Sequence, residues 1–342
     1  MGRPTKLSPY LFAIHIGGST VDSRPGFAQA RVMDPMGGHW RLPDELRELA
    51  AAQDGALLGT QLHPFVGRRQ LRGLTSSGVL DKLWRNTYAL PTDQADGASC
   101  GVRTRLTAAA LSLGRPVTAC LHTAAELYGA DIRGDRRTHV LAAVDSPSAL
   151  DGLVLHRPHL IRPHNDVDGR SVTDLSETTV RIAALERNPA KSLAVLDAAL
   201  RKTHVRQVEL SAVAAELSIR GVRQVRILIP LADGRAESPG ESWLRWVCIE
   251  AGLPAPTPQI QVTTGQGLRY RVDLGWPELR VGCEYEGVQF HTGAALHQDR
   301  ERYNELQRAG WLMLGVTHQM IWQRREHLVA QMRSMLEARI DR

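Results

Sequence analysis

The sequence lacks the motifs that mark several large enzyme classes. No Walker A loop, Rossmann glycine fingerprint, H-E-x-x-H pair or G-x-S-x-G elbow occurs in its 342 residues. No internal repeat or low-complexity tract is evident either. The sequence therefore gives no motif support for a P-loop or Rossmann nucleotide-binding protein, a zinc protease or a serine hydrolase.

Cysteine is scarce, and long hydrophobic runs are missing. The four cysteines show no C-x-x-C spacing, and two of them, Cys248 and Cys283, fall on predicted core faces. We therefore expect free buried thiols in a reducing compartment, as in a cytoplasmic protein. The apolar run at residues 7–16 is interrupted by Pro9 and His15, so it is too short to span a membrane and is a poor signal peptide.

Length and composition predict a multidomain globular chain. At 342 residues, two or three domains are expected, and 43% hydrophobic with 23% charged residues is ordinary for a soluble protein. The net charge of +6 mildly favours an anionic partner. Residues 1–40 are rich in glycine and proline, so we expect a disordered arm, or a true start codon at Met33 or Met36.

Three acids fall on one predicted β-hairpin near the C-terminus. Residues 269–285 are predicted to form two strands joined by turn residues at 275–277. Side chains alternate along a strand, so Glu284 and Glu286 share a side, and Asp273 can lie opposite them. Oxygen ligands at this density suit Mg²⁺ or Mn²⁺. The alternative is a solvated acidic sheet face.

Predicted helices flank this hairpin on both sides. Residues 238–252 form a helix with Glu241 in its first turn and a glycine stop. A second helix at 299–310, a short buried strand at 311–317 and a basic last helix at 324–339 follow the hairpin. The order is therefore helix, hairpin, helix, strand, helix.

This order, together with its acids, resembles the PD-(D/E)XK nuclease superfamily, in the branch of the very-short-patch-repair endonucleases. The matching motifs are Glu284-Tyr285-Glu286-Gly287, Asp299-Arg300-Glu301-Arg302 and Gly310-Trp311. Two positions depart from the pattern: Glu286 replaces the superfamily lysine, and Phe290 stands where relatives have a histidine. The resemblance implies a restriction-endonuclease-like domain at 236–342, with a three-layer α/β/α core and a central mixed sheet.

The resemblance also implies hydrolysis of DNA phosphodiesters with bound Mg²⁺ or Mn²⁺. Asp273 and Glu284 would hold the metal, and Glu241 would join through a water or a second ion. Glu286 or His291 would orient or deprotonate the attacking water. The remaining contacts would be Gln289 with the DNA backbone, and Asp299 and Arg302 facing the site.

For three of these residues, a role outside the catalytic site is the alternative. His291 can be an ordinary polar loop residue. Asp299 and Arg302 can pair with each other, because they lie three residues apart on one helix face.

The N-terminal part is predicted to form helices at 44–53, 59–63 and 64–74, followed by a hairpin-like wing at 82–90. This order resembles the winged helix-turn-helix of AbiEi-type antitoxins. We expect this domain to span 41–92. It would place Arg68, Arg69, Gln70 and Arg72 in the DNA major groove or against phosphates, and Lys82 and Arg85 on the backbone. The alternative is a small helical domain with a solvated basic face.

Between these parts, the sequence predicts helices at 118–128, 172–183, 192–200 and 211–217, and strands at 139–144 and 152–156. This order resembles the mixed α+β linking domain of AbiEi-like proteins, which we expect at 100–230. The fold class expected for the whole chain is therefore multidomain α/β (α+β). Two functions remain: a Mg²⁺-dependent DNA endonuclease, or a DNA-binding regulator of antitoxin type whose nuclease-like domain is catalytically degenerate. The second implies a toxin or another protein partner. Dimerisation is open, and the geometry of the carboxylates discriminates the two functions.

Overall fold

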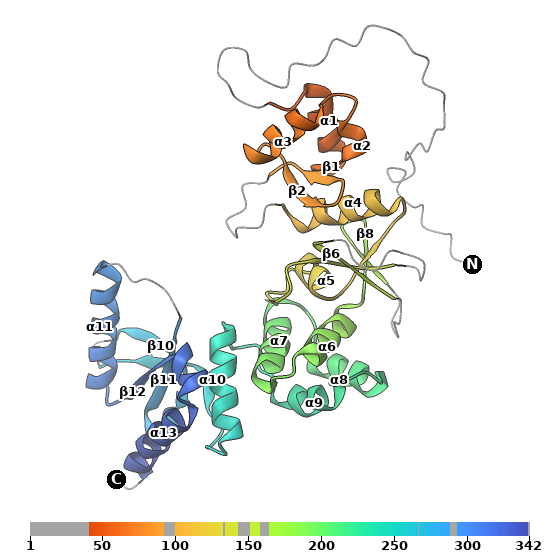
Figure 1. The fold of residues 1–342 in the computed structure, drawn as a ribbon. Helices are drawn as coiled ribbons and strands as arrows, with labels where there is room; N and C mark the ends of the chain where they lie inside the picture. Colours follow the sequence, from red (N-terminus) through yellow and green to blue (C-terminus); the bar gives the residue numbers. More distant parts are fainter. Residues whose placement is uncertain are drawn as a thin grey trace, which may run out of the picture. The chain divides into compact units, whose positions relative to one another are not determined.

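The computed structural model describes residues 41–91, 100–132, 134–142, 151–157, 164–265, 267–287 and 293–340, with the backbone alone for 293–300 (Figure 1). The described residues divide into two compact units. The first takes in the described parts of 1–123, 136–158 and 164–172, and the second those of 124–135 and 173–342.

The first unit begins with three helices and a small sheet. The sheet is antiparallel in the order β1-β3-β2, and Asn86 takes a positive φ of 59° in the turn of its β2-β3 hairpin. Leu46, Leu71 and Leu74 are buried and join the core of this part. The elements are α1 (Asp44–Ala52), β1 (Ala56–Leu58), α2 (Gly59–Leu62), α3 (Arg68–Ser76), β2 (Asp81–Trp84) and β3 (Thr87–Ala89).

A helix and a five-stranded sheet complete the first unit. The helix α4 (Val102–Leu113) anchors the small sheet, because Ser112 Oγ lies 2.8 Å from both Trp84 Nε1 and Thr87 Oγ1. The larger sheet has the order β6-β5-β4-β8-β7. Its strands are β4 (Thr118–Ala119), β5 (Thr138–Leu141), β6 (Leu153–His156), β7 (Asn165–Val167) and β8 (Arg170–Val172).

The helices that follow α5 (Leu121–Leu127) open the second unit. Asp174 caps α6 by accepting a hydrogen bond from Glu177 N–H at 3.0 Å, and Asn188 caps α7 by accepting from Ala190 N–H at 2.9 Å. The elements are α6 (Leu175–Leu185), α7 (Pro189–Lys202), α8 (Gln207–Glu216), α9 (Val222–Leu228) and the 3₁₀ turn η2 (Ile229–Leu231).

The rest of the second unit is built on a four-stranded mixed sheet in the order β12-β11-β10-β9. Only the β11-β12 pair is parallel within it. Before it comes α10 (Pro239–Glu250), capped by Ser238 with proline in its first turn. The other elements are β9 (Thr257–Thr263), β10 (Arg269–Trp276), η3 (Pro277–Leu279), β11 (Val281–Glu286), α11 (Gly293–Arg308), β12 (Leu312–Thr317), α12 (His318–Gln323) and α13 (Arg325–Ile340).

Two apolar clusters cover this sheet. Leu244 and Cys248 of α10 pack with Leu274, and with Met332 of α13. Leu306 of α11 packs in a separate cluster with residues of β9 and β10. The sheet thus lies between α11 and the helices α10 and α13, in an α/β/α arrangement (Figure 1).

A buried ion pair joins α10 to α7. Arg245 Nη2 lies 2.6 Å from Asp197 Oδ2, with side-chain exposures of 7% and 1%. Asp197 Oδ1 also accepts a hydrogen bond from Asp233 N–H at 2.8 Å, and Arg245 donates to the Leu231 carbonyl. The helices of 175–231 and the sheet domain are therefore fastened together inside one unit.

The structure confirms the mixed α+β, multidomain fold class. It places α1, α2, the wing strands, α6, α7 and α10 within a few residues of their predicted ranges. Three local predictions are wrong. Residues 118–119 form a strand instead of helix, the third helix starts at Arg68 because residues 63–65 form a turn, and the helix predicted at 299–310 starts earlier, at Gly293. All four cysteines are free and buried, as expected. Among the described residues no helix is long and apolar enough to cross a membrane.

Candidate functional site

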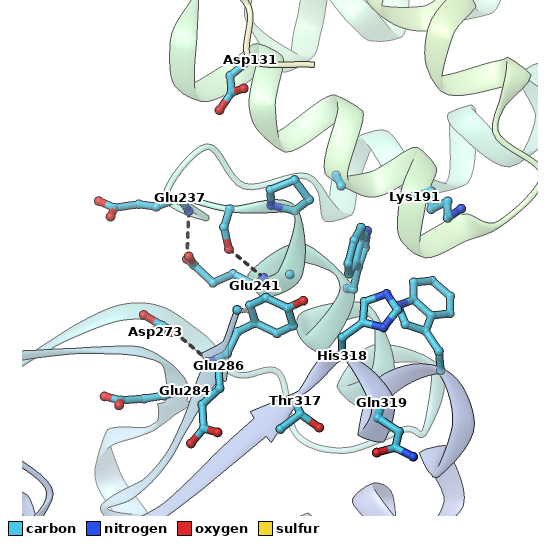
Figure 2. A pocket seen from close by; sticks show the side chains of 18 of the residues that line it. Asp131, Lys191, Glu237, Glu241, Asp273, Glu284, Glu286, Thr317, His318 and Gln319 are labelled. Carbon is cyan, nitrogen blue, oxygen red and sulfur yellow. Dashed lines mark hydrogen bonds between the residues drawn. The ribbon is translucent and has the colours of Figure 1, made fainter. Parts of the chain in front are cut away.

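The predicted acids line one groove of the second unit. Its walls come from the β10-β11 hairpin, α10, the start of α12 and the first half of α7 (Figure 2). At about 2230 Å³ it is far larger than a single ion requires. Seven carboxylates line it against three cations, Lys191, Arg271 and Arg302, so the groove is acidic overall.

Glu241 enters the groove from the first turn of α10. The Ser238 cap fixes this turn, because its Oγ accepts a hydrogen bond from Glu241 N–H at 3.2 Å. The Glu241 carboxylate accepts a hydrogen bond from Glu237 N–H at 2.8 Å (Figure 2). It also accepts one from Gln259 Nε2 at 2.7 Å. Burial raises the pKa of Glu241, and the neighbouring Asp273 charge raises it further.

Asp273 lies where the paired part of the β10-β11 hairpin ends. Its strand pairs with the next through Leu274 and Cys283, and Asp273 Oδ2 then accepts a hydrogen bond from Tyr285 N–H at 2.9 Å (Figure 2). Burial raises the pKa of Asp273, although Arg302 and Arg271 oppose the shift. The hairpin thus holds Asp273 close to Glu284, as its alternation predicts.

Glu284 is the most deeply buried acid of the hairpin, and it has a resident cation. Arg302 of α11 grips both carboxylate oxygens: Nη1 donates to Oε2 at 2.9 Å and Nη2 donates to Oε1. The same Nη2 also donates to the Arg271 carbonyl. Burial nevertheless raises the pKa of Glu284 to about 7, which means that desolvation outweighs the guanidinium.

These contacts bear on the predicted metal site. Each of Glu241, Asp273 and Glu284 already accepts hydrogen bonds from the protein, and Glu284 accepts them on both oxygens from a charged, two-pronged donor. Among the described residues no group of three His, Cys, Asp or Glu side chains is arranged to hold a metal ion. As arranged, the residues therefore do not fit a divalent cation, and the roles of Asp273 and Glu284 as ligands stay predictions.

The other predicted site residues have different outcomes. Glu286 is exposed and lies over Gly315, where a Cβ atom would stand 2.1 Å from its Oε1. Gln289 and His291 lie outside the described residues, as does the side chain of Asp299. Arg302 faces the site as predicted, although its direct grip on Glu284 was not foreseen.

An aromatic wall stands beside the acids, and the sequence did not reveal it. The Trp243 ring meets those of Tyr285 and Trp322 edge-on, with centroids 6.3 and 5.4 Å apart. Lys191 Nζ of α7 lies 6.0 Å from the centroid of the Trp322 ring. Gly240 admits Tyr285 to this wall, since a Cβ there would lie 2.1 Å from the ring.

The predicted DNA-contacting residues lie in the first unit. Arg68, Arg69 and Arg72 on α3, and Lys82 and Arg85 on the wing, are all exposed, and none forms an ion pair with another described residue. Gln70 differs, because its Oε1 accepts a hydrogen bond from Gly67 N–H at 2.7 Å and so caps α3. The basic face is therefore available, and its contact with DNA stays a prediction.

Comparison with known proteins places the chain in a family. Residues 117–231 match the model of the AbiEi antitoxin C-terminal domain. Two relatives from Mycobacterium tuberculosis, Uncharacterized protein MT2308 of strain CDC 1551 / Oshkosh and Uncharacterized protein Rv2248 of strain ATCC 25618 / H37Rv, are each 36% identical over 251 residues. Each alignment covers 73% of this chain and 89% of the relative. The chain therefore belongs to the family of these two mycobacterial proteins, and its residues 117–231 match the AbiEi antitoxin C-terminal domain.

Proposed function

We propose that the protein is a DNA-binding regulator of the antitoxin type, whose nuclease-like domain does not cut DNA. The match to the AbiEi antitoxin C-terminal domain carries this proposal. The exposed, unpaired cations of α3 and the wing support the DNA contact. The acidic groove, whose Glu284 is paired with Arg302, supports the absence of cleavage, because a net negative groove without a bound metal ion repels phosphates.

Binding to duplex DNA over a salt series tests the DNA contact. Affinity should fall steeply with salt, with a slope of about −0.9 for each neutralised phosphate. Arg69→Ala and Arg72→Ala in the full-length protein should each flatten the slope by about one if they touch only the backbone. Arg47→Ala is the matched control, since Arg47 lies in the same domain but already pairs with Asp44. Equal slopes for all four proteins would leave the basic face as a solvated surface.

The antitoxin reading also implies a toxin or another protein partner, in addition to DNA. Co-expression with a candidate toxin tests this: the full-length chain should relieve the growth arrest that the toxin causes. Variants at Arg69 or Arg72 should retain that relief if neutralisation and DNA binding use different surfaces. If the chain relieves the growth arrest of none of the candidate toxins, the antitoxin part of the proposed function is weakened, whereas its DNA-binding part is unaffected.

A Mg²⁺- or Mn²⁺-dependent endonuclease is the second candidate. One observation favours it: Glu241, Asp273 and Glu284 line the same groove, and burial raises the pKa of each. If it holds, wild type cleaves supercoiled, mismatched or single-stranded DNA. Asp273→Ala then lowers the rate on the order of 10²–10³. If wild type leaves every DNA uncut while Phe290→His gains activity, the regulator is favoured.

A further inference from the structure

The structure assigns Arg302 a specific role: it is an internal counterion that occupies the cation position on Glu284 and closes the carboxylate site to divalent metal. This inference rests on the proposed function, because it explains why a nuclease-like groove would not cut. It concerns metal binding alone, so its test can fail while DNA binding succeeds.

The first support is the geometry of the ion pair. A guanidinium presents a rigid fork that matches both oxygens of a carboxylate, and Arg302 uses that fork fully on Glu284. A metal ion would use one or both of the same oxygens, and a guanidinium already seated against them would repel it. Arg302 and a divalent cation therefore compete for one place on Glu284.

The second support is what holds Arg302 there. Its Nη2 also donates to the Arg271 carbonyl of β10, so the guanidinium is fixed to the strand that carries Asp273. Glu284 is only 6% exposed, and a buried carboxylate without a partner is costly. The fold therefore favours the closed arrangement unless another cation replaces Arg302.

The third support is the contrast with Arg271, the other arginine of the groove. Arg271 pairs with Glu237 at 2.6 Å, and both side chains are about half exposed. It touches none of the three acids of the proposed metal set through its side chain. Removing Arg271 therefore lowers the positive charge of the groove by the same amount as removing Arg302, without vacating Glu284.

Mn²⁺ binding to the full chain, followed at pH 8 by loss of the free-ion paramagnetic resonance signal, tests the inference. Arg302→Gln should bind Mn²⁺ about tenfold or more tightly than wild type, whereas Arg271→Gln should resemble wild type. The double variant Arg302→Gln with Glu284→Gln should lose the gain. Equal binding by wild type and Arg302→Gln, or an equal gain in Arg271→Gln, overturns the proposal.

A second variant, Arg302→Lys, tests the inference in a protein that is expected to keep its fold. Arg302→Lys keeps the charge but loses the two-pronged grip, so it should fold and bind Mn²⁺ with intermediate affinity. Thermal unfolding gives an independent readout, since Mn²⁺ should raise the melting temperature of Arg302→Gln and leave that of wild type unchanged. Arg302→Lys that matches wild type in both measurements contradicts the proposal.

Discussion

The basic face of α3 and the acidic groove of the second unit differ in whether their charged side chains have partners within the protein. Arg68, Arg69 and Arg72 stand exposed with no ion pair among the described residues. In the groove, by contrast, the buried Glu284 is paired with the partly exposed Arg302. Charges left unpaired are available to an outside partner, whereas charges that are paired within the protein are not. The chain's +6 net charge conceals this division.

The largest expected effect comes from breaking the buried ion pair between Asp197 and Arg245. Asp197→Ala should lower the free energy of unfolding by about 3–5 kcal/mol, because it leaves Arg245 buried without its partner. Denaturant titration of the full chain measures the change. Asp197→Leu combined with Arg245→Met is the control, and it should recover most of the loss. A small effect of Asp197→Ala alone would show that the pair is solvated in solution.

The next effect is a pH dependence set by Glu284. Its pKa is raised from 4.5 to about 7 in the fold, so its contribution to stability is complete below 4.5 and lost as the pH rises through 7. Between pH 5 and 8 wild type should therefore lose about 2–3 kcal/mol more than Glu284→Gln does. Denaturant midpoints across that range provide the comparison. Parallel curves for the two proteins would mean that Arg302 keeps Glu284 ionised throughout.

The smallest expected effect is the stability change on removing the unpaired charges. Arg69→Ala and Arg72→Ala should each alter the free energy of unfolding by no more than about 0.5 kcal/mol, since neither side chain is buried or paired. Thermal melts beside the DNA titrations measure this. A large destabilisation would mean that these arginines belong to the fold, and the contrast with the groove would collapse.

Sequence reasoning located the groove because its signals are local. Ser238 followed by Pro239 marks a helix start, and strand alternation puts Asp273 and Glu284 together. The helical period of α3 likewise puts Leu71 and Leu74 inside and its arginines outside.

What sequence reasoning missed depends on contacts between distant segments. Gln259, which hydrogen-bonds Glu241, lies on β9, a strand hidden among Pro254, Pro256 and Pro258. Alternating Ile260 and Val262 were the available signal for that strand. The contribution of α7 to the groove had no such signal, because Lys191 reaches Trp322 only through tertiary packing. Gln70 is a different case: the sequence predicted that it contacts DNA, and in the structure its side chain caps its own helix.

The ion pair between α7 and α10 also limits how this architecture can be rearranged. The antitoxin-domain match ends at residue 231, so Asp197 lies within it and Arg245 beyond it. Grafting a different domain after residue 231 would leave Asp197 facing a surface without its guanidinium. A recombination that keeps Asp197 must therefore also carry Arg245, or replace both partners with apolar residues. The packed unit in this chain is therefore larger than the segment that the family match outlines.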